Sequence, residues 1–157
     1  MQPIIESNAA ELRKLHKTMH ETSRHRSDGR EALEAWQKAC RELHDRWDSL
    51  AFPGGLRSGL NRIKAGDMQA IETAILYLEL RPFYFRAQYT RDVFTRLIKR
   101  QPLPDRLQLR FDATRARLRA WRAAKHARAE QSRAKASAHF FAKWQSEDLP
   151  ANPEGIQ

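Results

Sequence analysis

The most constraining feature of the sequence is the regular spacing of apolar side chains over residues 33–50. Successive apolar residues are three, four, three, four and three positions apart, namely Leu33, Trp36, Cys40, Leu43, Trp47 and Leu50. Because an α-helix has about 3.6 residues per turn, side chains at these intervals line one face of a helix. Such a face packs against another helix, either within the chain or in a second copy, and the pattern fits both pairings.

The same periodicity, interrupted by helix-breaking residues, predicts helices in the rest of the first half. Ser7 is a good N-cap for a first helix over residues 8–26. The segment 52–55, which contains Pro53 and two glycines, ends the second helix. A short third helix is expected to stop at Gly66, and Asp67 is placed to cap the helix that follows.

Three longer helices are expected in the second half. Residues 68–80 are apolar on most sides, which is typical of a central, buried helix, and Pro82 ends it. A helix over 87–100 follows, and the prolines within 101–104 stop it. A last helix is expected from 106 to about 137, and no strand pattern stands out anywhere. We therefore predict an all-α fold, a compact helical bundle of five to six helices with a long basic C-terminal helix.

The last helix changes character along its length. Leu107, Phe111, Leu118 and Trp121 are available for a core, but no large apolar residue then occurs until Phe140. The intervening sequence favours a helix but has nothing large to bury, so it is expected to project or to be ordered by a partner. The predicted organisation is a body over 4–121, a basic helical extension over 122–145 with an aromatic end, and a disordered acidic tail over 146–157.

Charge is distributed very unevenly, within a total of +10. Residues 1–85 carry a net charge of +1, residues 86–143 carry +12, and residues 144–157 carry −3. An asymmetry of this size points to a polyanionic partner or an anionic surface.

The basic half predicts contacts to nucleic-acid phosphates. Arginine predominates there, and its guanidinium suits bidentate contacts to phosphate. The residues expected to contact phosphate are Arg86, Arg91, Arg96, Lys99, Arg100, Arg115, Arg119, Arg122, Lys125, Arg128 and Arg133. The expected function is that of a small basic nucleic-acid-binding protein, or a subunit of a nucleoprotein complex, with little sequence specificity. The residues do not distinguish RNA from DNA.

An alternative function is that of a helical adaptor or inhibitor that binds an acidic surface of a protein partner. Its expected anchors are Phe140, Phe141 and Trp144, which have no obvious core helix around them. Membrane binding ranks last, because the basic extension lacks the large apolar face that interfacial helices bury. No apolar run long enough to span a bilayer and no signal peptide is seen, so a cytoplasmic location is expected.

An aromatic run lies between the two apolar helices of the second half. Phe83, Tyr84, Phe85 and Tyr89, interleaved with arginines, resemble in composition a platform on which single-stranded bases stack. Packing in the core is the favoured interpretation, with one or two rings left exposed. The flanking helices also invite comparison with a helix-turn-helix, but the long, proline-containing connection favours a plain helical hairpin.

Catalytic and metal-binding patterns are not evident. The glycines near Pro53 lack the lysine and spacing of a phosphate-binding loop, and Cys40 is the only cysteine. His16 and His20 are one helical turn apart, but no carboxylate or thiolate at ligand spacing accompanies them, which favours a solvated pair. We therefore expect no enzymatic activity, no cofactor and no metal.

Overall fold

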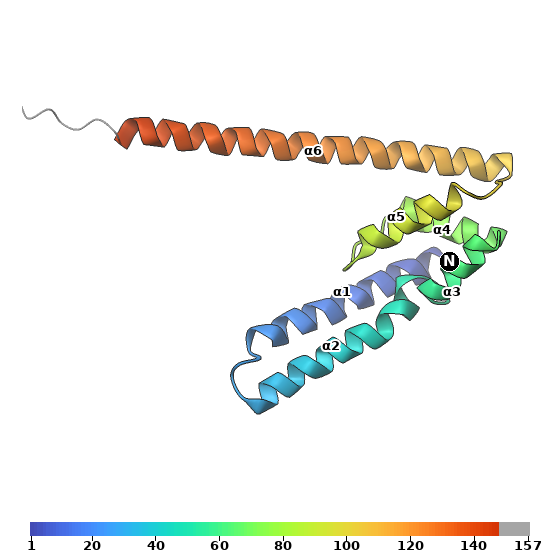
Figure 1. Ribbon diagram of the computed structural model, residues 1–157, viewed down its shortest axis with the longest axis horizontal. Helices are drawn as coiled ribbons and strands as arrows, with labels where there is room; N and C mark the ends of the chain where they lie inside the picture. Colours follow the sequence, from blue (N-terminus) through green and yellow to red (C-terminus); the bar gives the residue numbers. More distant parts are fainter. Residues whose placement is uncertain (148–157) are drawn as a thin grey trace, which may run out of the picture. The chain divides into compact units, whose positions relative to one another are not determined.

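Six helices make up most of the chain in a computed structural model that describes residues 1–147, with side chains described as far as 142. They are α1 (Gln2–Arg24), α2 (Arg30–Ala51), α3 (Leu56–Lys64), α4 (Met68–Leu80), α5 (Ala87–Ile98) and α6 (Asp105–Glu147) (Figure 1). Residues 1–147 contain no strand, so the predicted all-α fold is confirmed. The chain divides into two compact units, Met1–Thr114 and Arg115 onward, and we call the first unit the bundle.

The first two helices form an antiparallel hairpin within the bundle (Figure 1). Every third or fourth residue of α1 is buried, from Ile5 to Leu15, and the helix packs against α2 and α4. The predicted apolar face of α2 is only partly covered, because Leu43 is buried whereas Leu33 is exposed. In Figure 1 the far end of this hairpin has no helix of the bundle beside it. The residues of α2 near that end therefore keep contact with solvent.

Helix α4 is the centre of the bundle. It packs against α1, α3 and α5, and its buried side chains include Ile71, Ile75 and Leu78, as the sequence predicts. The helix begins where expected, because the Asp67 carboxylate accepts a hydrogen bond from the Ala70 amide (3.1 Å). A second hydrogen bond, from the Arg62 guanidinium (2.8 Å), is the main cause of a lowered pKa at Asp67.

Three aromatic rings pack edge to face in the core. The Phe94 ring lies 4.9 Å from that of Phe52 and 5.2 Å from that of Tyr77, measured between centroids. Such pairs contribute about 0.5–1.5 kcal/mol each beyond the burial of their surface. Gly59 lies against Phe52 so closely that a Cβ atom there would be 2.4 Å from the ring. This position of α3 therefore requires glycine.

Several predicted boundaries differ from the structure. Ser7 is not an N-cap, because α1 already begins at Gln2, where Pro3 is tolerated in the first turn. Leu107 and Phe111 of α6 are buried as expected, whereas Trp121 is exposed. The described helix runs on to Glu147, so residues 148–157 of the predicted acidic tail lie outside the described residues.

Candidate nucleic-acid interface

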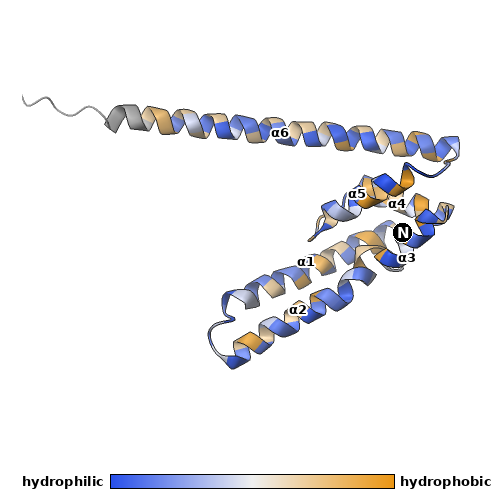
Figure 2. Cartoon of the chain, viewed as in Figure 1, coloured by the Kyte–Doolittle hydropathy of each residue, from blue (hydrophilic) through white to orange (hydrophobic). Residues whose placement is uncertain are grey.

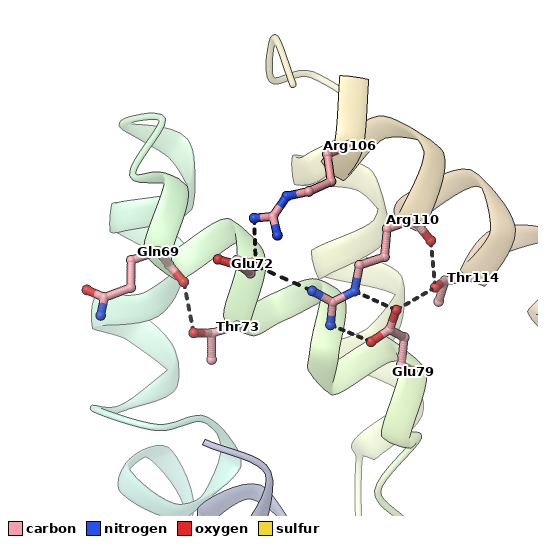
Figure 3. Close-up of polar contacts among 7 residues, drawn as sticks. All are labelled: Gln69, Glu72, Thr73, Glu79, Arg106, Arg110 and Thr114. Carbon is pink, nitrogen blue, oxygen red and sulfur yellow. Dashed lines mark hydrogen bonds and ion pairs between the residues drawn. The ribbon is translucent and has the colours of Figure 1, made fainter. Parts of the chain in front are cut away.

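The first turns of α6 are fixed to α4 by ion pairs (Figure 3). The Arg110 guanidinium donates two parallel hydrogen bonds to the Glu79 carboxylate, at 2.8 and 2.6 Å, and this carboxylate raises the pKa of Arg110. Arg106 donates to Glu72 (3.2 Å), and the Thr114 hydroxyl donates to the Arg110 carbonyl (2.9 Å). These arginines hold the helix on the bundle, and their charge is matched within the fold.

The composition of α6 changes after Thr114. We call residues 115–142 the basic segment. It contains one acidic residue, Glu130, and eight basic ones: Arg115, Arg117, Arg119, Arg122, Lys125, Arg128, Arg133 and Lys135. Every side chain of the segment is exposed except those of Arg115 and Leu118, which are half-buried. Hydrophilic residues recur along the whole described length of α6 (Figure 2). The segment therefore combines high positive charge with no apolar core of its own.

The basic side chains of the segment form two stripes. With about 100° of rotation per residue, one stripe holds Arg115, Arg119, Arg122, His126 and Arg133. Arg117, Arg128 and Lys135 fall on nearly the opposite side. Many of the residues between the stripes are alanines, whose short side chains let the helix backbone approach a ligand closely. Phosphates on two sides of such a helix are within reach of guanidinium groups.

The predicted phosphate-binding residues of the bundle fall into two groups. Arg96, Lys99 and Arg100 are exposed around the C-terminal end of α5. Arg91 instead donates to the Pro82 carbonyl and to the Gln88 side chain, both at 3.0 Å. The Arg91 guanidinium therefore holds the loop between α4 and α5.

That loop, residues 81–86, has a constrained backbone. Arg81 and Arg86 both have positive φ angles, 49° and 66°, which cost a side-chain-bearing residue about 1–2 kcal/mol each. Two side chains from the first hairpin offset this cost by holding loop carbonyls. Arg13 of α1 donates to the Phe83 carbonyl (2.9 Å), and the Trp47 indole of α2 donates to the Phe85 carbonyl (3.4 Å).

The buried ring of Tyr84 anchors the same loop to the core. Its hydroxyl contacts that of Tyr77 and lies within hydrogen-bonding distance of two acceptors for its single proton, the Ala51 carbonyl (3.1 Å) and the Thr90 hydroxyl (3.4 Å). Burial raises the pKa of both tyrosines, so both are neutral hydrogen-bonding groups at ordinary pH.

The other aromatic rings of the run face solvent, so the favoured core interpretation holds for Tyr84 alone. Phe83, Tyr89 and Phe85 are 78%, 60% and 41% exposed. Outward Phe83, inward Tyr84 and outward Phe85 alternate along the loop, as side chains do in extended chain. One or two exposed rings were expected, and the structure exposes three of the four.

The ring of Phe85 is exposed but contacts two side chains. It stacks on His16 of α1 with 4.8 Å between ring centroids, and the Arg86 guanidinium lies 5.0 Å from its centre. His16 in turn makes an edge contact with His20 at 4.4 Å. Burial, and secondly the charge of His20, lower the pKa of His16. No group of three or more His, Cys, Asp or Glu side chains within the described residues is arranged to hold a metal ion.

The far end of the basic segment carries the predicted partner-binding aromatics. Phe140 and Phe141 are 66% and 61% exposed, and their rings meet edge to face at 6.0 Å. Trp144 lies on α6, but its side chain is outside the described residues. No helix in the described part of the chain is both long and apolar enough to span a bilayer.

No protein family, curated protein or solved structure matches this chain.

Proposed function

We propose that this protein binds nucleic acid through the phosphate backbone, with little dependence on sequence, and that the basic segment makes the main contacts. The supporting observation is a helical stretch with eight basic residues and one acidic residue, in which almost every side chain faces solvent. Solvated helices more often alternate the sign of their charges. A polyanion supplies the negative charge that the segment itself lacks.

Counterion release provides most of the binding free energy in such a complex. Each phosphate that a basic side chain neutralises contributes about −0.9 to the slope of log affinity against log salt concentration for duplex DNA, and about −0.7 for single strands. The 28 residues of the segment extend over about 42 Å, which is enough to contact several phosphates. Arg96, Lys99 and Arg100 at the end of α5 are proposed as further contacts.

Charge neutralisation with a matched control tests this proposal. Fluorescence anisotropy is measured on labelled DNA and RNA strands of about 15 nucleotides, and on their duplexes, between about 50 and 200 mM salt. Changing Arg119, Arg122 and Arg133 to Gln removes three charges from one stripe. The control changes Lys38, Arg41 and Lys64 to Gln, because these bundle side chains are also exposed.

The stripe variant is expected to lose about tenfold or more in affinity at the lower salt concentration, and its salt slope to fall by about one for each lost contact. The affinity and the salt slope of the control variant are expected to differ much less from those of the unmodified protein. The proposal is wrong if the unmodified protein binds no nucleic acid at low salt, or if the control loses as much affinity as the stripe variant.

The exposed Phe140 and Phe141 rings favour a second candidate, an adaptor that binds an acidic protein surface. Aromatic side chains at this degree of exposure are typical anchors of protein interfaces. Under this candidate, changing both phenylalanines to Ala abolishes partner binding, and the purified protein shows no salt-sensitive affinity for nucleic acid.

A further inference from the structure

The loop 81–86 and the first turn of α5 present aromatic rings to solvent from a firmly held backbone. The Phe83 and Tyr89 rings are more than half exposed, while the chain between them is fixed by Tyr84 in the core. Single exposed apolar residues are common on protein surfaces, but three exposed rings within seven residues form a local group. Aromatic rings held on a rigid backbone are suited to binding a flat ligand, because the protein loses little conformational entropy on binding.

The surroundings of these rings are positively charged. The loop region, residues 81–91, contains three arginines and no acidic residue. Residues 13–20 of α1, which contact the loop through Arg13 and His16, contain three further basic residues and no acidic one. The nearest acid along α5 is Asp92, whose carboxylate accepts from the Gln88 amide at 2.9 Å. The surface therefore combines aromatic rings with positive charge.

We propose that this surface binds unpaired nucleotides, with Phe83 and Tyr89 stacking on bases and Arg86 contacting the adjoining phosphate. The proposal rests on the proposed function and specifies its ligand class as single-stranded nucleic acid. Every base has a flat face, so stacking tolerates any sequence, whereas the bases of a duplex are already stacked on one another. Phe85 is the less available ring, because His16 and Arg86 already contact it.

An abasic strand separates stacking from phosphate binding. Anisotropy is measured for the full chain on a labelled single strand of about 15 nucleotides and on a strand of the same length without bases. The test variant changes Phe83 and Tyr89 to Ala, and its fold is checked by circular dichroism, since both rings are exposed. A second variant, Phe83→Trp with Tyr89→Phe, keeps two flat rings and is expected to retain binding. Phe85 is left unchanged because its ring packs on His16.

The unmodified protein is expected to bind the normal strand about tenfold more tightly than the abasic one, and the alanine variant to lose this difference. Binding to the abasic strand should be unchanged in that variant. Equal affinity of the unmodified protein for both strands, or a preference that survives in the alanine variant, overturns the proposal. A preference that survives would show that other residues of the protein contact the bases.

If the protein does not bind nucleic acid at all, the same measurements give a different result. In that case neither strand binds at low salt, and the stripe variant of the basic segment behaves like the unmodified protein. If both strands bind equally and the stripe variant weakens both, phosphate binding stands and only the stacking surface is refuted.

Discussion

Two stretches of α6 differ in charge: residues 105–114 hold two basic and two acidic side chains, whereas the basic segment holds eight basic and one acidic. Arg106 and Arg110, in the first turns, are paired with Glu72 and Glu79 of α4. In the basic segment the one acidic residue is Glu130, and the basic side chains are almost all exposed. Carboxylates of α4 hold the arginines of the first turns, whereas the basic segment exposes most of its positive charge to solvent, where an external anion can reach it.

The apolar residues of α6 show the same contrast. Phe111 is fully buried in the bundle, whereas Trp121, ten residues later, is 40% exposed with the Lys125 ammonium 5.5 Å from its ring centre. Stability should therefore depend on the first turns of α6 and very little on the basic segment.

Truncation of the two aromatic residues should give very different losses of stability. Phe111→Ala is expected to lower the free energy of unfolding by about 3–5 kcal/mol, because it removes a buried ring and leaves a cavity. Trp121→Ala should change it by less than about 0.5 kcal/mol, as is usual for exposed positions. Urea denaturation followed by circular dichroism measures both values. Similar losses in the two variants would show that the basic segment is part of the folded core.

Removal of one carboxylate from each stretch should affect different properties. Glu79→Gln is expected to cost about 1–2 kcal/mol of stability, because Arg110, a third exposed, loses a charged bidentate partner. Glu130→Gln should leave stability unchanged and strengthen nucleic-acid binding by a few-fold through the added net charge. Denaturation and anisotropy on the same two proteins check both statements. A stability loss in Glu130→Gln, or none in Glu79→Gln, would contradict them.

The smallest expected effect is on the pH dependence of stability, through His16. The pKa of His16 is lowered in the folded protein, so the unfolded chain binds the proton more readily. The stability from this site is therefore fully present above the ordinary histidine pKa of about 6.5, and decreases as the pH falls below it. Melting temperatures between about pH 8 and pH 5 should fall less steeply in His16→Gln. The groups that contact His16 are Phe85 and His20, and Phe85 in turn contacts Arg86. An unchanged slope would show that the contacts of His16 do not depend on its charge.

The sequence was sufficient for the all-α class, for the start of α4 at its Asp67 cap and for the end of α4 before Pro82, because these depend on local periodicity and capping. It did not reveal the pairing of Arg110 with Glu79, which are 31 residues apart. It also predicted one or two exposed rings in the aromatic run without identifying Phe83 and Tyr89, because local composition does not show which side of a loop is covered. The Arg110–Glu79 pair and the exposure of the two rings both depend on how α4 packs against its neighbours.

The proposed division of roles is that the bundle folds by its own packing and that the basic segment binds nucleic acid. Hydrogen exchange of the full chain, with and without a saturating single strand, tests it most directly. Amides of residues 115–142 should exchange quickly in the free protein and slow markedly in the complex, while the core of α4 stays protected in both. If residues 115–142 exchange at the same rate with and without nucleic acid, the claim is contradicted.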